Sequence, residues 1–246
     1  MSTKEDSIMG GGNMQEVGDG NRGDGLAPSE RHLEDHLWAH PGALGTLDFM
    51  EGANFRQVPS YSMLMRQVRI PAGIMDLVGI NDKLRIVELK RGTITAQSFT
   101  QVMRYTRDIR FLMEKCIDRY IALELPLYED VMRRWQGDGF YTNDLIGATL
   151  IGHAYENENL LIACAACDVD VYIYDYRDGR YTFQEVDTPK VYQSPAWDQL
   201  MALRDKKLGG HLIGFLAEHV ATYGNIQFDA IDAANEYLSR APGGAK

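Results

Sequence analysis

Apolar residues recur along this chain with two different periods. Alternating or continuous apolar runs predict strands at residues 66–71, 73–80, 84–90, 147–155 and 168–176. Apolar residues spaced three and four apart predict helices at residues 29–40, 95–115 and 156–167, with two or three more between 195 and 240. Short loops at 81–83 and at Asp178-Gly179 should close two antiparallel hairpins.

The order of these elements predicts an α/β domain with a mixed sheet flanked by helices. The strands at 147–155 and 168–176 are joined through a helix, so we expect them to be parallel. The predicted divisions are a disordered, acidic, glycine-rich tail over 1–27, a domain over 28–190, and a helical C-terminal extension over 191–246. The domain carries an insertion at about 119–144, in which 121–125 reads as a strand and 128–135 as a short helix.

Composition places the chain among ordinary globular proteins. It has 246 residues, of which 45% are hydrophobic and 24% charged. The N-terminus has no signal-peptide pattern, and no apolar run is long enough to span a bilayer. Three cysteines do not suggest a disulfide framework. We therefore expect a cytoplasmic protein with no membrane partner.

Charge is distributed unevenly. The formal net charge of −10 argues against a protein that coats nucleic acid without specificity, because phosphate binding needs clustered Lys and Arg. Residues 66–110, however, hold nine basic and four acidic residues, so this segment carries +5 and the remainder −15. A local basic surface on an acidic body would suit a polyanion bound at one place.

Three ionisable residues stand among the apolar residues of the 73–90 hairpin. A loop centred on Asp82 places Asp76 opposite Glu88 on the same face, with Cβ atoms roughly 5 Å apart. Two like charges this close repel each other, whereas a hard cation such as Mg²⁺ would make the arrangement favourable. Lys90, on the same face, could steer or deprotonate an attacking water, or steady a phosphate oxygen.

The flanking helices add polar groups to this set. Gln101 and Tyr105 lie one turn apart on the helix after Lys90. Glu30, in the first turn of the first helix, could supply a third carboxylate, with Glu34 as the competing candidate.

Together these residues resemble the PD-(D/E)xK nuclease superfamily. The set consists of Asp76, then Glu88-Leu89-Lys90, then Gln101-x-x-x-Tyr105, and it is most similar to RecB-like nucleases and to the catalytic domain of NucS/EndoMS-type DNA endonucleases. Ser29-Glu30-x-x-Leu33…His40-Pro41 resembles the first core helix of that group and favours Glu30 over Glu34. The resemblance covers about residues 29–186 and implies a restriction-endonuclease-like fold.

The resemblance also implies a reaction. Asp76, Glu88 and the main-chain carbonyl of Leu89 would hold Mg²⁺, with Mn²⁺ able to substitute, and Lys90 would activate the water. Gln101 and Tyr105 would support the site and the phosphate backbone. The substrate would be DNA, cut as an endonuclease or an exonuclease, in repair or defence.

Two departures keep another function open. Met75 stands where the motif has its nominal proline, and the glycine-rich tail replaces the N-terminal DNA-binding domain of NucS-type enzymes. The alternative is a catalytically silent binding or regulatory protein with a nuclease fold. In either case the C-terminal helices could form a lid, a homodimer contact or a site for a protein partner.

Other motifs have simpler interpretations. Asp76, Glu88 and Lys90 could be a solvated hairpin face, and the Tyr105 ring could only cap the core. We expect the remaining candidates to be structural: the row His32, His36 and His40, the pair Cys164 and Cys167, and the alternating Tyr172, Tyr174 and Tyr176, which should pack under the C-terminal helices.

Overall fold

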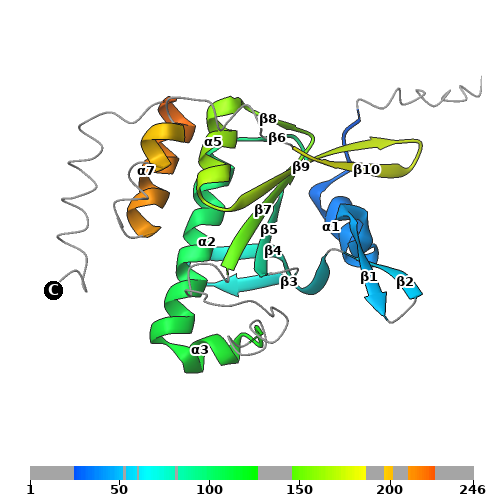
Figure 1. Cartoon of the computed structure of the whole chain (residues 1–246), viewed down its shortest axis with the longest axis horizontal. Coiled ribbons are helices and arrows are strands. Elements are labelled where there is room, and N and C mark those ends of the chain that lie inside the picture. The colour runs from blue at the N-terminus through cyan, green and yellow to red at the C-terminus, as the bar shows by residue number, and fades with distance from the viewer. Residues whose placement is uncertain are drawn as a thin grey trace, which may run out of the picture.

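A six-stranded mixed sheet lies at the centre of the fold (Figure 1). The computed structural model describes residues 25–51, 54–59, 61–80, 83–126, 146–186, 197–201 and 210–224. The strands lie in the order β10 (Arg180–Glu185), β9 (Val169–Arg177), β7 (Ile146–Gly152), β5 (Leu84–Leu89), β4 (Gly73–Ile80) and β3 (Ser62–Ile70). As predicted, β7 and β9 are parallel, as are β5 and β7, while both hairpins are antiparallel. The predicted α/β class is confirmed, and the arrangement is consistent with a restriction-endonuclease-like fold.

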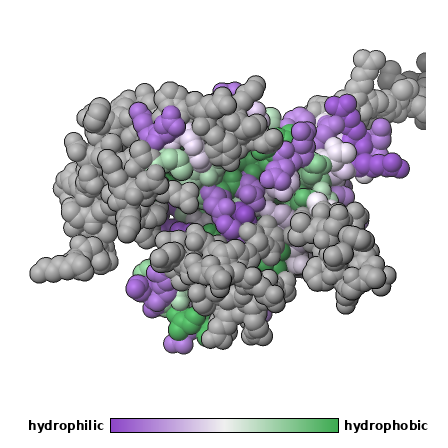
Figure 2. All heavy atoms as spheres, in the orientation of Figure 1, coloured by the Kyte–Doolittle hydropathy of each residue, from purple (hydrophilic) through white to green (hydrophobic). Residues whose placement is uncertain are grey.

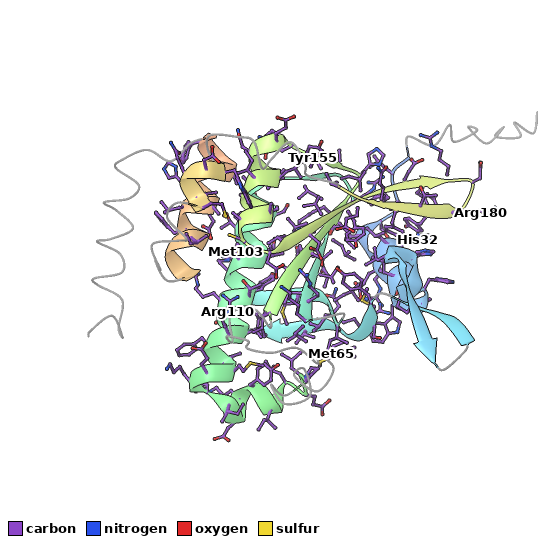
Figure 3. The ribbon with its side chains drawn as sticks, viewed as in Figure 1. His32, Met65, Met103, Arg110, Tyr155 and Arg180 are labelled. Carbon is purple, nitrogen blue, oxygen red and sulfur yellow. The ribbon has the colours of Figure 1, made fainter. Side chains whose placement is uncertain are left out.

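Helices cover both faces of this sheet. On one face lie α2 (Ala96–Lys115), α5 (Glu158–Ala166) and α7 (Gly210–Tyr223), and on the other lies α1 (Glu30–Ala39) (Figure 1). Figure 3 shows the same division, with His32 of α1 beside the β9–β10 hairpin and Arg110 of α2 across the sheet. The apolar faces of α1, α2 and α5 pack against strands, while α7 packs on α5 and α2, which explains the helical spacing in the sequence.

Polar side chains fix where the three predicted helices begin. Ser29 accepts a hydrogen bond from the N–H of His32 (3.0 Å) and so caps α1. Thr95 and Ser98 form a reciprocal capping box at the start of α2. Asn157 caps α5 in the same way as Ser29 caps α1. These caps set the orientation of α1 and α2, from which the candidate site takes half of its side chains.

The register of the β4–β5 hairpin is the predicted one. Leu77 lies opposite Val87, and the antiparallel pairing continues to the loop after Ile80. Because side chains alternate across a strand, Ile86 packs toward α2 while Val87 packs toward α1. Glu88 therefore lies on the α2 side, as expected from the sequence.

Some elements are smaller or more divided than predicted. A 3₁₀ helix, η1 (Pro41–Leu44), and a separate hairpin of β1 (Thr46–Glu51) and β2 (Asn54–Pro59) precede the sheet. The strand predicted at 147–155 is two strands, because β8 (Ala154–Tyr155) leaves the sheet to pair with β6 (Thr93–Ile94). At the break a side chain on Gly152 would lie 2.9 Å from the carbonyl oxygen of Gly92.

The ends and the insertion also differ from prediction. Residues 121–125 are not a strand, because α3 (Ile117–Ala122) and a turn occupy them. The predicted helix at 128–135 lies outside the described residues, as do residues 1–24 of the predicted disordered tail. Residues 25–27 of that tail are packed instead: Ala27 is fully buried, and Gly25 accepts a hydrogen bond from the N–H of Tyr176 (2.8 Å).

The described part of the C-terminal extension belongs to the domain core. In α7, Leu216, Ala217 and Val220 are buried in the same cluster as α2 and α5. Exposed apolar side chains gather elsewhere, on Phe111, Ile117 and the neighbouring turn of α3, and Figure 2 shows apolar surface at this lower edge. None of the helices described here combines the length and apolarity that crossing a membrane requires.

Candidate active site

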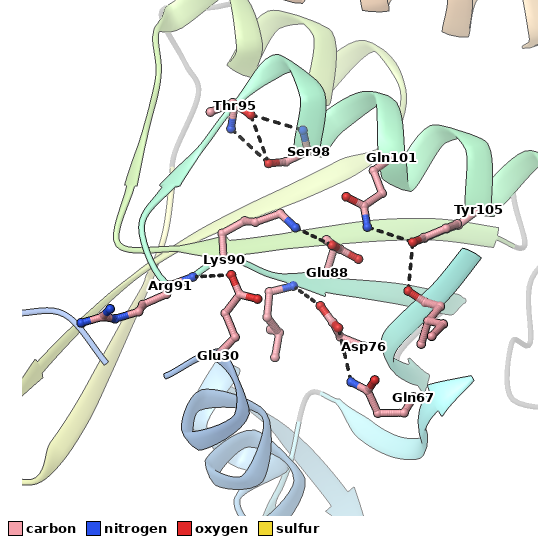
Figure 4. Close-up of polar contacts among 12 residues, drawn as sticks. Glu30, Gln67, Asp76, Glu88, Lys90, Arg91, Thr95, Ser98, Gln101 and Tyr105 are labelled. Carbon is pink, nitrogen blue, oxygen red and sulfur yellow. Dashed lines mark hydrogen bonds and ion pairs between the residues drawn. The ribbon is translucent and has the colours of Figure 1, made fainter. Parts of the chain in front are cut away.

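The structure brings the predicted site residues together between α1 and α2, beside the ends of β4 and β5 (Figure 4). They come from four elements and the turn after β5: Glu30 from α1, Asp76 from β4, Glu88 from β5, Lys90 directly after it, and Gln101 and Tyr105 from α2. Residues as far apart in sequence as Glu30 and Tyr105 thus border one small region.

Asp76 lies where the β4–β5 pairing stops. The last paired position is Leu77 opposite Val87. Beyond this pair, the Oδ2 atom of Asp76 accepts a hydrogen bond from the N–H of Leu89 (2.9 Å). A side-chain oxygen on β4, instead of a backbone carbonyl, is thus the acceptor at this position. Burial raises the pKa of Asp76, while the Leu89 N–H and the charge of Lys90 act in the opposite direction.

Glu88 is the most unusual group in the site. Its side chain is 3% exposed, and its Oε1 atom lies 2.6 Å from the amine of Lys90. Its Oε2 atom is buried and has no hydrogen-bond partner among the residues that the structure describes. Burial, followed by the charge of Asp76, raises the pKa of Glu88 to about 7. One oxygen of this carboxylate therefore lacks, among the described residues, the polar partner that normally accompanies a buried acid.

Lys90 is held in its charged form. Burial alone would lower the pKa of its amine, but the hydrogen bond and charge of Glu88, together with the charges of Glu30 and Asp76, raise it above the usual value. An amine with a raised pKa is a poor proton acceptor at neutral pH. In this state Lys90 is suited to orient or neutralise a negative group rather than to remove a proton.

The acids fit a cation that keeps several of its own waters. Asp76 and Glu88 offer two carboxylates side by side, and the Leu89 peptide adjoins them through its N–H. Within the described residues, no three His, Cys, Asp or Glu side chains converge to form a ready-made metal cage. Mg²⁺ in proteins is commonly bound by one or two carboxylates and water, so the set is sufficient for that ion.

Both candidate acids of α1 adjoin this site, in different ways. Glu30 is exposed and accepts a hydrogen bond from the N–H of Arg91 (3.1 Å), next to Lys90. Glu34, one turn later, is buried and lies 2.8 Å from the Nε of Arg66. Glu34 reaches the site only through an intervening side chain, that of Gln67, which donates to it over 2.8 Å.

Gln101 and Tyr105 bond to each other and to the sheet. The Gln101 amide donates to the Tyr105 hydroxyl (2.8 Å), which itself donates to the carbonyl oxygen of Ile74 (2.9 Å). Tyr105 is buried, and its ring is part of the core cluster beneath α2. Its hydroxyl is therefore already used to hold the start of β4, as the simpler interpretation of this residue anticipated.

Comparison with known proteins assigns no family. No protein-family model matches the chain, and no curated protein sequence matches it significantly. A solved structure described as "Structure of EndoMS-dsDNA2 complex" aligns with 54% of this chain and 38% of that chain, at 16% identity and a TM-score of 0.31. The chain thus spans well under half of that protein, and a likeness this low assigns no activity.

Several basic residues of segment 66–110 pair with acids or with a carbonyl oxygen. Arg66 pairs with Glu34 and Asp35, Lys83 with Asp168, Arg85 with Asp168 and Asp170, and Arg110 with the carbonyl oxygen of Ile146. Burial raises the pKa of Glu218 on α7, and the charges of Arg107 and Arg104 counteract part of this rise. These contacts neutralise part of the charge of the segment, while Arg69, Arg91, Arg104 and Arg107 are exposed, so the local basic surface stays a prediction.

The remaining motifs are structural in the described part of the chain. His36 and His40 stack with ring centroids 4.6 Å apart, and His32 hydrogen-bonds through Nδ1 to the hydroxyl of Tyr181 (2.7 Å). The imidazoles thus form an aromatic stack with the β9–β10 hairpin instead of converging on a metal. Burial raises the pKa of the Cys164 thiol, which suits an inert core residue.

One packing prediction is corrected. Tyr172 and Tyr174 are buried, as expected, but they face α1 rather than the C-terminal helices. The Tyr174 hydroxyl donates to the carbonyl oxygen of Arg91 and accepts from the N–H of Ala27 (3.2 Å). Tyr174 thus holds the segment before α1 and the turn after β5 together, and so helps to place Glu30 beside Lys90.

Proposed function

We propose that this protein is a divalent-metal-dependent nuclease that hydrolyses phosphodiester bonds in DNA. The observation that carries the proposal is the state of Glu88. One of its oxygens bonds to Lys90, and the other is buried without a partner among the described residues, next to the acid of Asp76. Such a pair weakens a folded protein on its own. A divalent cation bound by both carboxylates would neutralise their repulsion and make the arrangement favourable.

In this proposal Asp76 and Glu88 hold Mg²⁺, with Mn²⁺ as a substitute, and the main-chain carbonyl of Leu89 assists. The metal would supply charge stabilisation at the phosphate and an activated water. The N–H of Leu89 fixes the direction of the Asp76 carboxylate. Lys90, kept protonated by Glu88, would hold a phosphate oxygen or orient the attacking water.

The outer residues have supporting roles in the same scheme. Glu30 is exposed on α1, and its charge acts on both Asp76 and Glu88. Tyr105 holds the start of β4 through the carbonyl oxygen of Ile74, and so supports the strand that carries Asp76. Gln101, which is half-buried, donates to that hydroxyl.

The direct test is cleavage of labelled duplex and single-stranded DNA with Mg²⁺ or Mn²⁺. Asp76→Asn and Lys90→Ala should fold as the unmodified protein does and lose cleavage by about 10²–10⁴-fold, the usual cost of removing a positioned catalytic group. Matched controls are Glu158→Gln and Lys115→Ala, at exposed positions on α5 and α2. Cleavage at the unmodified rate by either site variant would refute the proposal.

A second candidate is a catalytically silent binding or regulatory protein with the same fold. The net charge of −10 favours it, and so does the pairing of Arg66, Lys83 and Arg110 with acids or a carbonyl oxygen, which leaves these three less available to a polyanion. It predicts no metal-dependent cleavage of any DNA structure, and a protein partner, or a second copy, bound through the C-terminal helices. Calorimetric titration with Mn²⁺ separates the two: only the nuclease predicts heat of binding that is lost in Glu88→Ala.

A further inference from the structure

Gln67 on β3 has a backbone conformation that its side chain does not favour. Its φ angle is +52°, in the left-handed region that glycine adopts freely and other residues rarely adopt. The side chain is exposed, so close packing does not require glutamine at this position. A non-glycine residue held in this region often marks a site where function sets the conformation.

The left-handed turn aims Gln67 at the candidate metal site. The two flanking positions are paired normally, Arg66 with Leu77 and Val68 with Met75, so Gln67 lies opposite Asp76 in the β3–β4 ladder. Its Nε2 atom lies 3.4 Å from Oδ1 of Asp76 (Figure 4). The other oxygen of that carboxylate is bonded to the Leu89 N–H, so both oxygens of Asp76 have a donor.

The same amide is anchored on the far side by a buried acid. Gln67 Nε2 lies 2.8 Å from Oε2 of Glu34, and the guanidinium of Arg66 lies 2.8 Å from the other oxygen of Glu34. Both neighbours of the amide are acceptors, so the NH₂ group faces them and uses one hydrogen for each. An anchored amide of this kind limits rotation of the Asp76 carboxylate.

We propose that Gln67 is a positioning residue for the metal site, which holds Asp76 in the orientation that binds a divalent cation. The inference rests on the proposed function, because it assigns a role at the same site. Glu34, although buried and not itself beside the acid pair, acts as the anchor of Gln67. Groups that orient a ligand from behind typically change metal affinity by about 10- to 100-fold when removed.

Gln67→Gly separates this role from a purely structural one. Glycine tolerates the left-handed angle, so the backbone should keep its shape while the amide is lost. The matched control is Asp178→Gly, since Asp178 has a similar φ of +50° in the turn between β9 and β10 and takes no part in the site. Both variants should unfold cooperatively at temperatures close to that of the unmodified protein.

The measurement is calorimetric titration of the full chain with Mn²⁺ alone, followed by DNA cleavage over a range of Mn²⁺ concentrations. Gln67→Gly should bind Mn²⁺ about 10- to 100-fold more weakly, and excess Mn²⁺ should restore its cleavage. Asp178→Gly should match the unmodified protein in both. DNA cleavage by Lys90→Ala should not recover with excess Mn²⁺, because this variant lacks the amine and not a group that positions the metal.

Three results would overturn the inference. Unchanged Mn²⁺ affinity in Gln67→Gly would reduce Gln67 to a turn residue while leaving the proposed nuclease intact. Absence of Mn²⁺ binding in the unmodified protein would refute the proposed function and this inference with it. If Gln67→Gly does not fold, Gln67→Asn replaces it, because asparagine tolerates the same φ angle but is one methylene too short to span Glu34 and Asp76. The third contradicting result is an unchanged Mn²⁺ affinity in Gln67→Asn.

Discussion

At the scale of single residues, burial and charge at Glu88 oppose each other. The carboxylate is buried with one oxygen unbonded among the described residues, and Asp76 adds a second negative charge next to it. Its ion pair with Lys90 offsets only part of this cost, because the pKa of Glu88 remains raised to about 7 from an ordinary 4.5. The site is therefore electrostatically strained without a cation.

This strain predicts how stability depends on pH in the absence of divalent metal. Between pH 4.5 and about 7 the folded protein keeps a proton on Glu88 that the unfolded chain releases. Stability should therefore fall as pH rises through this range, and level off above it, with a total cost of about 3 kcal/mol. Asp76, whose pKa is also raised, contributes in the same direction.

Urea unfolding at pH 5, 6, 7 and 8 in a chelator measures this effect. Glu88→Gln should be less sensitive to pH than the unmodified protein, and Glu158→Gln should retain the full dependence. Added Mg²⁺ should restore stability at pH 8 in the unmodified protein and in Glu158→Gln but not in Glu88→Gln, because a bound cation stabilises the ionised acids. An unmodified protein that becomes more stable between pH 5 and 7 would contradict the raised pKa of Glu88.

At the scale of elements, the site depends on how α2 is joined to β4. Tyr105 connects them, since its ring is buried under α2 and its hydroxyl donates to the carbonyl oxygen of Ile74. Gly73 makes this close approach possible: a side chain there would lie 2.8 Å from the Tyr105 oxygen. The phenol thus acts as a structural strut between a helix and a strand of the site.

Tyr105→Phe should separate support from chemistry. Loss of the hydroxyl leaves the Ile74 carbonyl without this donor, so the free energy of unfolding should decrease by about 1 kcal/mol. DNA cleavage should fall less than in Lys90→Ala, because the ring still holds α2 against the sheet. The control is Tyr223→Phe, at an exposed position on α7. Cleavage lost completely with stability unchanged would instead place the Tyr105 hydroxyl at the substrate.

At the scale of the whole molecule, the described part of the C-terminal extension completes the core. Its helix α7 buries Leu216 and Val220 against α5 and α2, in the same cluster as the parallel strands β7 and β9. The site lies at the ends of β4 and β5, so α7 supports it only through the layer of helices between them. An extension packed in this way should not be separable from the domain.

Leu216→Ala tests this arrangement. Leu216 is fully buried, and truncating a buried leucine typically costs about 2–5 kcal/mol because a cavity remains. The control Tyr223→Ala, at an exposed position on the same helix, should change stability by less than about 0.5 kcal/mol. Chemical denaturation of both variants gives the comparison. Unchanged stability in Leu216→Ala would mean that α7 is only loosely attached.

The sequence predicted the elements whose signals are local. The caps at Ser29 and Thr95 and the register of the β4–β5 pairing involve residues close together in the chain, and these predictions were confirmed. The break at Gly152 was not predicted, because it depends on Gly92, which is distant in sequence. The strand at 121–125 was misassigned for the same reason, because contacts with another element decide the structure there. Tyr120, which belongs to α3 (Ile117–Ala122), is buried in one cluster with residues of α2.

The sequence by itself determined the mixed α/β order and the alternation that places Asp76 and Glu88 on adjacent strands, because strand period and hairpin register are local properties. Only the tertiary structure decided which oxygen of Glu88 lacks a partner among the described residues, that Gln67 turns toward Asp76, and that Lys83 pairs with the distant Asp168. These features depend on burial and on contacts between distant segments. The chain order does not encode them until the sheet and its helices have packed.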